Sequence, residues 1–167
     1  MRRPLSVLLA GLLCLAPAPL PAALTSTFQV SAQVVAGCLV VGGVSTYGNL
    51  DFGNYSALIS GPVTTALSGT TVTLQCTPGV NLSMSINAGQ NSSSGSRNLK
   101  RSSSSQLVAY QLFSDAGFSQ NLGIDQSVAL SYSDANTIKL PVYARAQLTG
   151  TLPAGSYTDV VQVQLTW

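Results

Sequence analysis

The side chains that most enzymes use for acid–base and nucleophilic chemistry are scarce in this 167-residue chain. It contains no histidine, and its five acidic residues are all aspartates. A Ser-His-Asp triad is therefore impossible, and general acid–base catalysis would fall to aspartates alone. Two of them could in principle act as a glycosidase pair, but they are scattered along the sequence. We expect no enzymatic activity and no cofactor.

The aspartates also have structural interpretations. Asp51, Asp115 and Asp134 lie beside predicted turns, where an aspartate commonly accepts hydrogen bonds from its own backbone. Asp159 shares the parity of the apolar residues in the last predicted strand, so its side chain should face inward. A buried carboxylate needs a partner, and we expect a hydrogen bond or an ion pair with Arg97 or Arg145.

Residues 1–23 have the parts of a secretion signal. Arg2 and Arg3 precede an apolar run over residues 5–16, and a Pro/Ala region ends at Ala23. The run is too short to span a membrane, and no later segment is apolar enough to do so. Once the two signal arginines are removed, five Lys and Arg residues balance five aspartates. Nucleic-acid binding then has no electrostatic support.

Two cysteines, Cys38 and Cys76, follow the predicted signal. An even pair in an exported chain predicts a disulfide, worth roughly 4 kcal/mol for a loop of this size. Metal binding is the weaker alternative, because two thiols without histidine or glutamate cannot complete a zinc shell. A single disulfide in an exported chain indicates a bacterial periplasm or cell surface, with no metal site.

The rest of the sequence is typical of an all-β sandwich. Helical periodicity is nearly absent, and Val, Thr, Ser, Tyr and Gly dominate, with turn residues about every ten positions. Residues 87–105, rich in Ser, Asn and Gly, predict an exposed hairpin or mobile loop. Neither a repeat nor a linker occurs, which predicts one domain over residues 24–167. The predicted strands cover residues 27–35, 38–41, 50–55, 70–76, 82–86, 106–113, 128–132, 137–148 and 160–167.

The first and last predicted strands have the clearest alternation. In the first, Phe28, Val30, Ala32 and Val34 share one parity, and Gln29, Ser31 and Gln33 take the other. In the last, the apolar parity is held by Val161, Val163, Leu165 and Trp167. No tight-turn signal pairs residues 27–35 with the segment that follows. This strand could therefore complete its own sheet or a neighbour's sheet.

With the strands laid out, the sequence resembles the spore coat protein U family, whose exported members include the Csu-type pilins of archaic chaperone–usher pili. The resemblance covers essentially all of residues 24–167. It is carried by the N-terminal alternating strand up to Cys38, Leu50-Asp51-Phe52-Gly53-Asn54-Tyr55, the segment around Cys76, Ile86-Asn87-Ala88-Gly89, Arg97-Asn98-Leu99, Leu140-Pro141-Val142-Tyr143, and Pro153-Ala154-Gly155-Ser156-Tyr157-Thr158-Asp159.

The resemblance implies an immunoglobulin-like Greek-key β-sandwich that lacks one strand. A periplasmic chaperone would lend a strand, and an outer-membrane usher would exchange it for the N-terminal strand of the next pilin subunit. Residues 24–36 would then be the donor strand. The donor side chains would be Phe28, Val30, Ala32 and Val34. The acceptor groove would run beside the strand of Val161, Val163, Leu165 and Trp167.

These implications lead to a first hypothesis and an alternative. The chain would be a structural subunit of a surface pilus, a homo- or hetero-polymer built by donor-strand exchange that supports adhesion or biofilm formation. It would pass through the periplasm of a Gram-negative bacterium to the cell surface. The alternative is a monomeric, secreted or coat-associated β-sandwich that binds a ligand in the manner of a lectin or adhesin.

Overall fold

The computed structural model describes residues 28–41, 47–67 and 73–167. Its contacts divide the chain into two units, residues 1–34 and 35–167, each considered by itself. In the first unit, residues 28–34 contain no strand, and Phe28, Val30 and Val34 are 86 %, 82 % and 94 % exposed. The signal peptide predicted for residues 1–23 lies outside the described residues.

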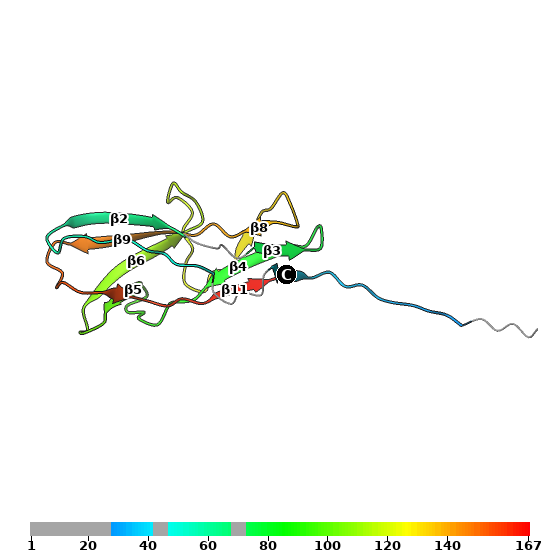
Figure 1. Ribbon diagram of the computed structural model, residues 1–167, viewed down its shortest axis with the longest axis horizontal. Helices are drawn as coiled ribbons and strands as arrows, with labels where there is room; N and C mark the ends of the chain where they lie inside the picture. The colour runs from blue at the N-terminus through cyan, green and yellow to red at the C-terminus, as the bar shows by residue number, and fades with distance from the viewer. Residues whose placement is uncertain (1–27, 42–46, 68–72) are drawn as a thin grey trace, which may run out of the picture. The chain divides into compact units, whose positions relative to one another are not determined.

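All regular secondary structure in the described part of residues 35–167 is β-strand (Figure 1). The all-β prediction is therefore confirmed, and the described residues contain no helix that could cross a membrane. The strands are β1 (Cys38–Val41), β2 (Ser60–Ala66), β3 (Thr73–Cys76), β4 (Leu82–Ile86), β5 (Arg97–Arg101), β6 (Leu107–Phe113), β7 (Val128–Leu130), β8 (Ile138–Lys139), β9 (Tyr143–Thr149), β10 (Tyr157–Thr158) and β11 (Val163–Thr166).

The strands form three antiparallel sheets around one core. A five-stranded sheet has the order β10-β5-β6-β9-β2, and two three-stranded sheets have the orders β1-β3-β8 and β11-β4-β7. Alternation decides which side chains enter the core, because successive side chains of a strand point to opposite faces. In β4, Leu82, Met84 and Ile86 are buried, and they meet Leu112 of β6 and Ala144 of β9. Sheets that share a core in this way form a β-sandwich.

Several predicted strand boundaries were wrong. Strand β2 was not predicted, since its Gly61 and Pro62 resemble a turn. Pro62 is tolerated there because β2 lies at the edge of its sheet, where a missing N–H need not break the ladder. Residues 50–55 form no strand, and the strand predicted over residues 137–148 is split into β8 and β9. Residues 70–72 of another predicted strand lie outside the described residues.

Residues 87–105, predicted as an exposed hairpin or mobile loop, contain β5, which pairs with β6, and the predicted exposure was wrong for part of this segment. Arg97 and Asn98 are only 4 % and 6 % exposed. The Arg97 guanidinium donates hydrogen bonds to four main-chain carbonyls, those of Ile86 (2.6 Å), Leu122 (2.7 Å), Asn87 (2.8 Å) and Gly123 (3.1 Å). These carbonyls compensate the loss of water around a buried charge, so the guanidinium ties β5 to β4 and to the loop after β6.

Candidate functional site

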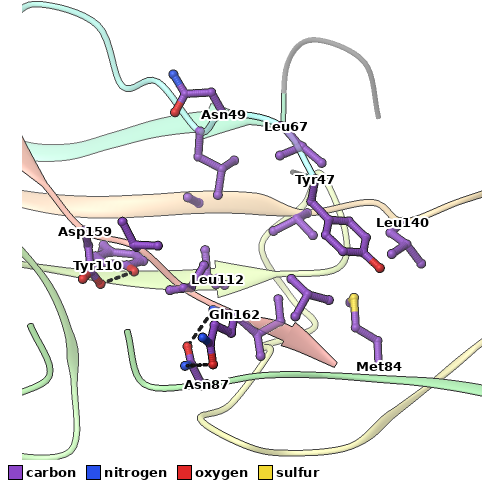
Figure 2. Close-up of a pocket in the computed structure, with 18 of the residues that line it drawn as sticks. Tyr47, Asn49, Leu67, Met84, Asn87, Tyr110, Leu112, Leu140, Asp159 and Gln162 are labelled. Atoms are coloured by element: carbon purple, nitrogen blue, oxygen red, sulfur yellow. Dashed lines mark hydrogen bonds between the residues drawn. The ribbon is translucent and has the colours of Figure 1, made fainter. Parts of the chain in front are cut away.

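A cavity of about 960 Å³ enters the core of residues 35–167 (Figure 2). Its floor includes Met84, Ile86, Leu112 and Ala144, which are among the most buried side chains of the domain. Protein interiors are close-packed and contain few voids larger than a water molecule. A cavity of this size is therefore unusual for a packed domain, although the four side chains of its floor are at most 2 % exposed.

We call this cavity the groove. It is lined by residues 47–50, 84–87 and 159–164, together with Phe52, Leu67, Leu99, Tyr110, Leu112, Asp125, Leu140, Val142 and Ala144. Figure 2 shows that Tyr47 and Asn49 come from the segment before β2, whereas Asp159 and Gln162 come from the segment that leads into β11. The floor is thus made by β4, β6 and β9, and these two segments supply further lining.

The edge of β11 presents main-chain hydrogen-bonding groups. The N–H of Asn87 donates to the Gln162 carbonyl (3.0 Å), and the N–H of Gln162 donates to Asn87 Oδ1 (2.8 Å), so residue 162 faces β4. Main-chain direction alternates along an antiparallel pair, so the N–H and C=O of Val163 and Leu165 point away from β4. Within the described residues β11 pairs with β4 alone. Its other edge is therefore open to a further strand.

The structure places the predicted acceptor residues in different environments. Val161 and Val163 line the groove and pack against the core. Leu165 also packs against the core but lies outside the lining, and Trp167 is 57 % exposed. Sequence reasoning did not identify the floor of the groove. Its residues come from three strands, and only the alternation within each strand could have indicated them.

A polar network closes around Asp159 at the margin of the groove. The Tyr110 hydroxyl donates to Asp159 Oδ2 (2.7 Å), and Oδ1 accepts from the N–H groups of Gln90 (2.9 Å) and Asn91 (3.1 Å). Gly89 has a φ of +80°, and a Cβ there would collide with this carboxylate. The carboxylate is thus inward-facing, as predicted, but its hydrogen bonds come from a tyrosine, main-chain amides and the Asn91 side-chain amide (3.0 Å) instead of an arginine. Its full set of donors indicates a structural role.

The other predicted turn aspartates do bond their own backbone. The N–H of Gly53 donates to Asp51 (2.8 Å), that of Gln120 to Asp115 (2.7 Å), and that of Asn136 to Asp134 (2.9 Å). The hydrogen bond from Gln120 is the main reason that the pKa of Asp115 lies below its ordinary value. The described residues contain no group of three or more His, Cys, Asp or Glu side chains placed to hold a metal ion.

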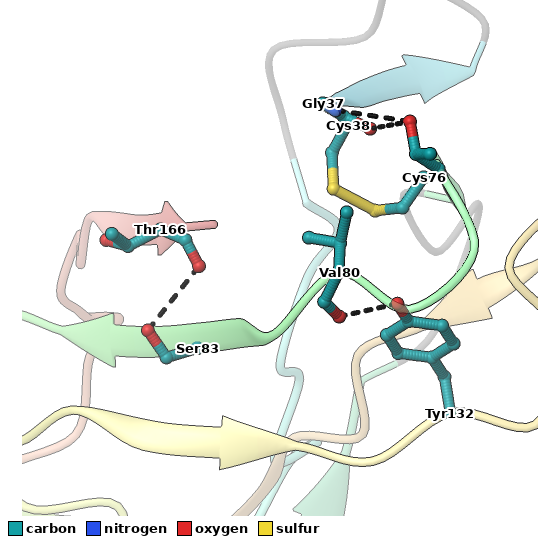
Figure 3. Close-up of a disulfide and its surroundings, with 8 residues drawn as sticks. Gly37, Cys38, Cys76, Val80, Ser83, Tyr132 and Thr166 are labelled. Carbon is teal, nitrogen blue, oxygen red and sulfur yellow. Dashed lines mark hydrogen bonds between the residues drawn. A yellow bond between two sulfur atoms is a disulfide. The ribbon is translucent and has the colours of Figure 1, made fainter. Parts of the chain in front are cut away.

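A disulfide joins Cys38 to Cys76 with an S–S distance of 2.06 Å, which confirms the predicted pairing (Figure 3). Cys38 is the first residue of β1 and lies directly opposite Cys76, the last residue of β3. The preceding Gly37 is also held, because its N–H donates to Thr77 Oγ1 (3.2 Å) and its carbonyl accepts from the Thr77 N–H (2.9 Å). The point where the N-terminal segment joins the domain is therefore fixed.

The Tyr110–Asp159 hydrogen bond predicts a pH-dependent effect of Tyr110→Phe. Losing the hydroxyl should cost about 1–3 kcal/mol in free energy of unfolding at pH 7, because Asp159 loses a donor. Burial, and then the bond to Asp159, raise the pKa of Tyr110 above its ordinary value. The unfolded tyrosine therefore ionises first, near pH 10, and this contribution to wild-type stability falls as the pH rises further.

The measurement is urea unfolding of both proteins between pH 7 and pH 11. The stability gap between wild type and Tyr110→Phe should narrow by about 1 kcal/mol at pH 11, because only the wild type carries this titrating group. A gap that stays constant over this range would contradict the assignment.

Removing the disulfide by Cys38→Ser should lower the free energy of unfolding by about 4 kcal/mol and reduce the yield of folded protein. The reason is that the bridge closes a 38-residue separation and anchors the first strand. Protease half-life of the purified protein is the measurement, with Ser83→Ala as a control substitution on a nearby strand. An unchanged half-life in Cys38→Ser would show that the bridge is unimportant for stability.

A solved structure similar to this chain is the CsuC–CsuE chaperone–tip adhesion subunit pre-assembly complex from archaic chaperone–usher Csu pili of Acinetobacter baumannii. That match has 19 % identity and a TM-score of 0.48, and covers 80 % of this chain and 40 % of that chain. Another is a chaperone–tip adhesin complex described as vital for synergistic activation of CFA/I fimbriae biogenesis. There the identity is 17 % and the TM-score 0.45, with 78 % and 41 % coverage.

The chain thus spans 40 % and 41 % of the length of these two solved chains. No curated protein matches it. The family model of the Spore Coat Protein U domain matches residues 24–164, which is most of the sequence. The chain therefore belongs to the Spore Coat Protein U domain family.

Proposed function

We propose that this protein is a structural subunit of a chaperone–usher pilus, and that its groove receives an extended strand from another protein. The observation that carries the proposal is the coincidence of the groove with the open edge of β11. An added strand would fill the groove and pair with the open edge of β11 at once. Its main chain would hydrogen-bond to Val163 and Leu165, and its alternate side chains would fill the core-lined cavity.

The N-terminal segment has the properties of such a strand. Phe28, Val30, Ala32 and Val34 alternate with polar residues, and residues 28–36 carry no charge. Phe28, Val30 and Val34 are largely exposed. Burying these three side chains in a neighbour's groove would contribute on the order of 5–8 kcal/mol before the cost of ordering the segment. Each subunit would then donate at one place and accept at another, a head-to-tail arrangement that extends into a fibre.

This assembly requires partners before the fibre forms. A domain with an open strand edge beside an apolar cavity is prone to aggregate, so a periplasmic chaperone would cover the groove first. An outer-membrane usher would then exchange the chaperone for the next pilin. The mature protein would be exported through the periplasm to a surface pilus that supports adhesion or biofilm formation.

A monomeric binding module is the second candidate. Its support is the groove itself, because ligand pockets are commonly apolar cavities of about 300–1,000 Å³. The open edge of β11 favours a strand as the occupant. A small apolar ligand would fill the cavity but would leave the main-chain groups of Val163 and Leu165 without partners.

The first test is Phe28→Asp, compared with Gln29→Asp. The Phe28 substitution should abolish fibres, because it places a charge in an apolar groove, whereas Gln29→Asp puts the same charge on the opposite face of the strand. Sizing chromatography and SDS gels of unheated protein measure assembly as a ladder that collapses on boiling. A wild-type ladder from Phe28→Asp would disprove the donor assignment, and a stable wild-type monomer would favour the binding module.

A second test uses proline on the acceptor edge. Val163→Pro removes an N–H that points to the open edge of β11, so the domain should still fold, but strand addition should fail. Gln164→Pro, one residue away, removes an N–H that faces β4 and should instead lower folded yield. Unheated gels and protease resistance together separate the two effects. A normal ladder from folded Val163→Pro protein would contradict strand addition at this edge.

A further inference from the structure

We propose that the outward face of the five-stranded sheet carries a second binding site, which takes a sugar with a carboxylate group, such as a uronic acid. The site centres on Arg145 of β9. Its neighbours Ala144 and Ala146 are buried, so Arg145 has the parity that points away from the core. The groove is lined by residues of the buried parity, and the second site therefore lies on the opposite face of the sheet. It does not depend on the proposed function.

The guanidinium of Arg145 is held in place by aromatic rings. Its Cζ lies 4.9 Å from the centroid of the Phe113 ring and 5.8 Å from that of Phe118. Nη2 donates a hydrogen bond to Gln111 Oε1 (3.3 Å). The contact with the rings positions the guanidinium but uses none of its N–H donors. The charge is thus fixed on the surface with most of its donors available to a ligand.

The charge of Arg145 has no acidic counterpart. Within the part of the chain that the structure describes, Gln111 is the one side chain that accepts a hydrogen bond from Arg145, and no aspartate forms an ion pair with it. The five N–H donors of an arginine form a fork that matches the two oxygens of a carboxylate. No second cation lines the cavity beside Arg145. A singly charged carboxylate therefore suits this site better than a doubly charged phosphate.

The position of Phe118 is maintained at a conformational cost. Its φ is +55°, a value that bulky residues rarely adopt. Asp115 holds the loop by accepting hydrogen bonds from the N–H groups of Ser119 (3.0 Å) and Gln120 (2.7 Å). The Phe118 ring thereby packs edge-to-face on Phe113, with the ring centroids 5.4 Å apart. Strained conformations persist where the surroundings fix them, and they cluster at binding sites.

A cavity of about 390 Å³ lies beside Arg145, and the strand register explains it. Gln111 of β6 is opposite Arg145, and Gln147 of β9 is opposite Pro62 of β2. Ala109 has the same outward parity as Gln111, and its short side chain leaves a hollow among the longer ones. The lining includes Pro62, Ser96, Ala109, Gln111, Arg145 and Gln147.

This lining matches a sugar in size and in chemistry. Ligand pockets commonly measure about 300–1,000 Å³, so the cavity suits a small ligand. The two glutamine side chains and the Ser96 hydroxyl can each donate and accept hydrogen bonds, as sugar hydroxyls do. Pro62 and Ala109 offer apolar contact to the C–H groups of a sugar ring. The carboxylate of a uronic acid would then pair with Arg145, the one charged residue of the described lining.

The first test is saturation-transfer NMR of the purified full chain with three probes: glucuronate, glucose and acetate. Glucuronate should bind with a Kd on the order of 1 mM. Glucose lacks the carboxylate and acetate lacks the ring, so each should bind at least about tenfold more weakly. Absence of transfer to glucuronate at roughly ten times that Kd would overturn the proposal. Equal binding of acetate would overturn the sugar assignment, and equal binding of glucose would overturn the role of the charge.

Substitutions then locate the site. Arg145→Lys keeps the charge but removes the fork, and it should weaken glucuronate binding at least about tenfold. Ala109→Leu fills the hollow and leaves Arg145 in place, and it should have a similar effect. Lys100→Gln is the matched control, because Lys100 is an exposed cation on the same face of the sheet but outside the lining.

Urea unfolding confirms that each variant is folded, so a loss of binding is separated from a loss of structure. Unchanged binding in folded Arg145→Lys and Ala109→Leu would overturn the site. A loss in Lys100→Gln equal to that in Arg145→Lys would show attraction by net charge alone and would overturn it as well.

A uronic acid can be free or part of an acidic polysaccharide, and an oligomer of glucuronate distinguishes these sources. Transfer to its terminal ring alone would support recognition of a chain end, and transfer to interior rings would support recognition along a polysaccharide. Binding of the monomer without binding of the oligomer would support a free uronate.

Discussion

The rest of this domain depends on one constraint, the open edge of β11 beside an apolar cavity. Met84, Ile86 and Leu112 belong to the packed interior and also form the floor of the groove. At the same place the main chain of Val163 and Leu165 faces an open sheet edge. Main-chain hydrogen-bonding groups without a partner strand and an apolar cavity thus lie at the same place. The proposal that an extended strand adds here depends on this coincidence.

The remaining structure keeps the groove open without losing the fold. At one margin, Arg97 and Asp159 are held by carbonyls, amides and the Tyr110 hydroxyl, so these polar groups fix the segments that line the groove. Near the C-terminal end of β11, the Cys38–Cys76 bridge fixes the start of the first strand. These attachments hold in place the segments that border the groove.

Sequence reasoning was most successful where structure is local. Alternation identified β4 and β6, the cysteine count predicted the disulfide, and the turn positions of Asp51, Asp115 and Asp134 predicted their hydrogen bonds. It failed where context overrides composition. Gly61 and Pro62 concealed β2, which is tolerated only because it is an edge strand. The polar, basic composition around Arg97 predicted exposure, but four carbonyls from distant segments made burial possible.

The sequence by itself determined the all-β class, the pairing of the cysteines and the alternating face of residues 28–34, because each follows from neighbouring residues or from a simple count. Only the tertiary structure decided where the groove lies, since its floor comes from strands far apart in the chain. The same holds for the partner of Asp159, which is Tyr110, 49 residues away. It also holds for the open edge of β11, because which main-chain groups face outward depends on the register with β4.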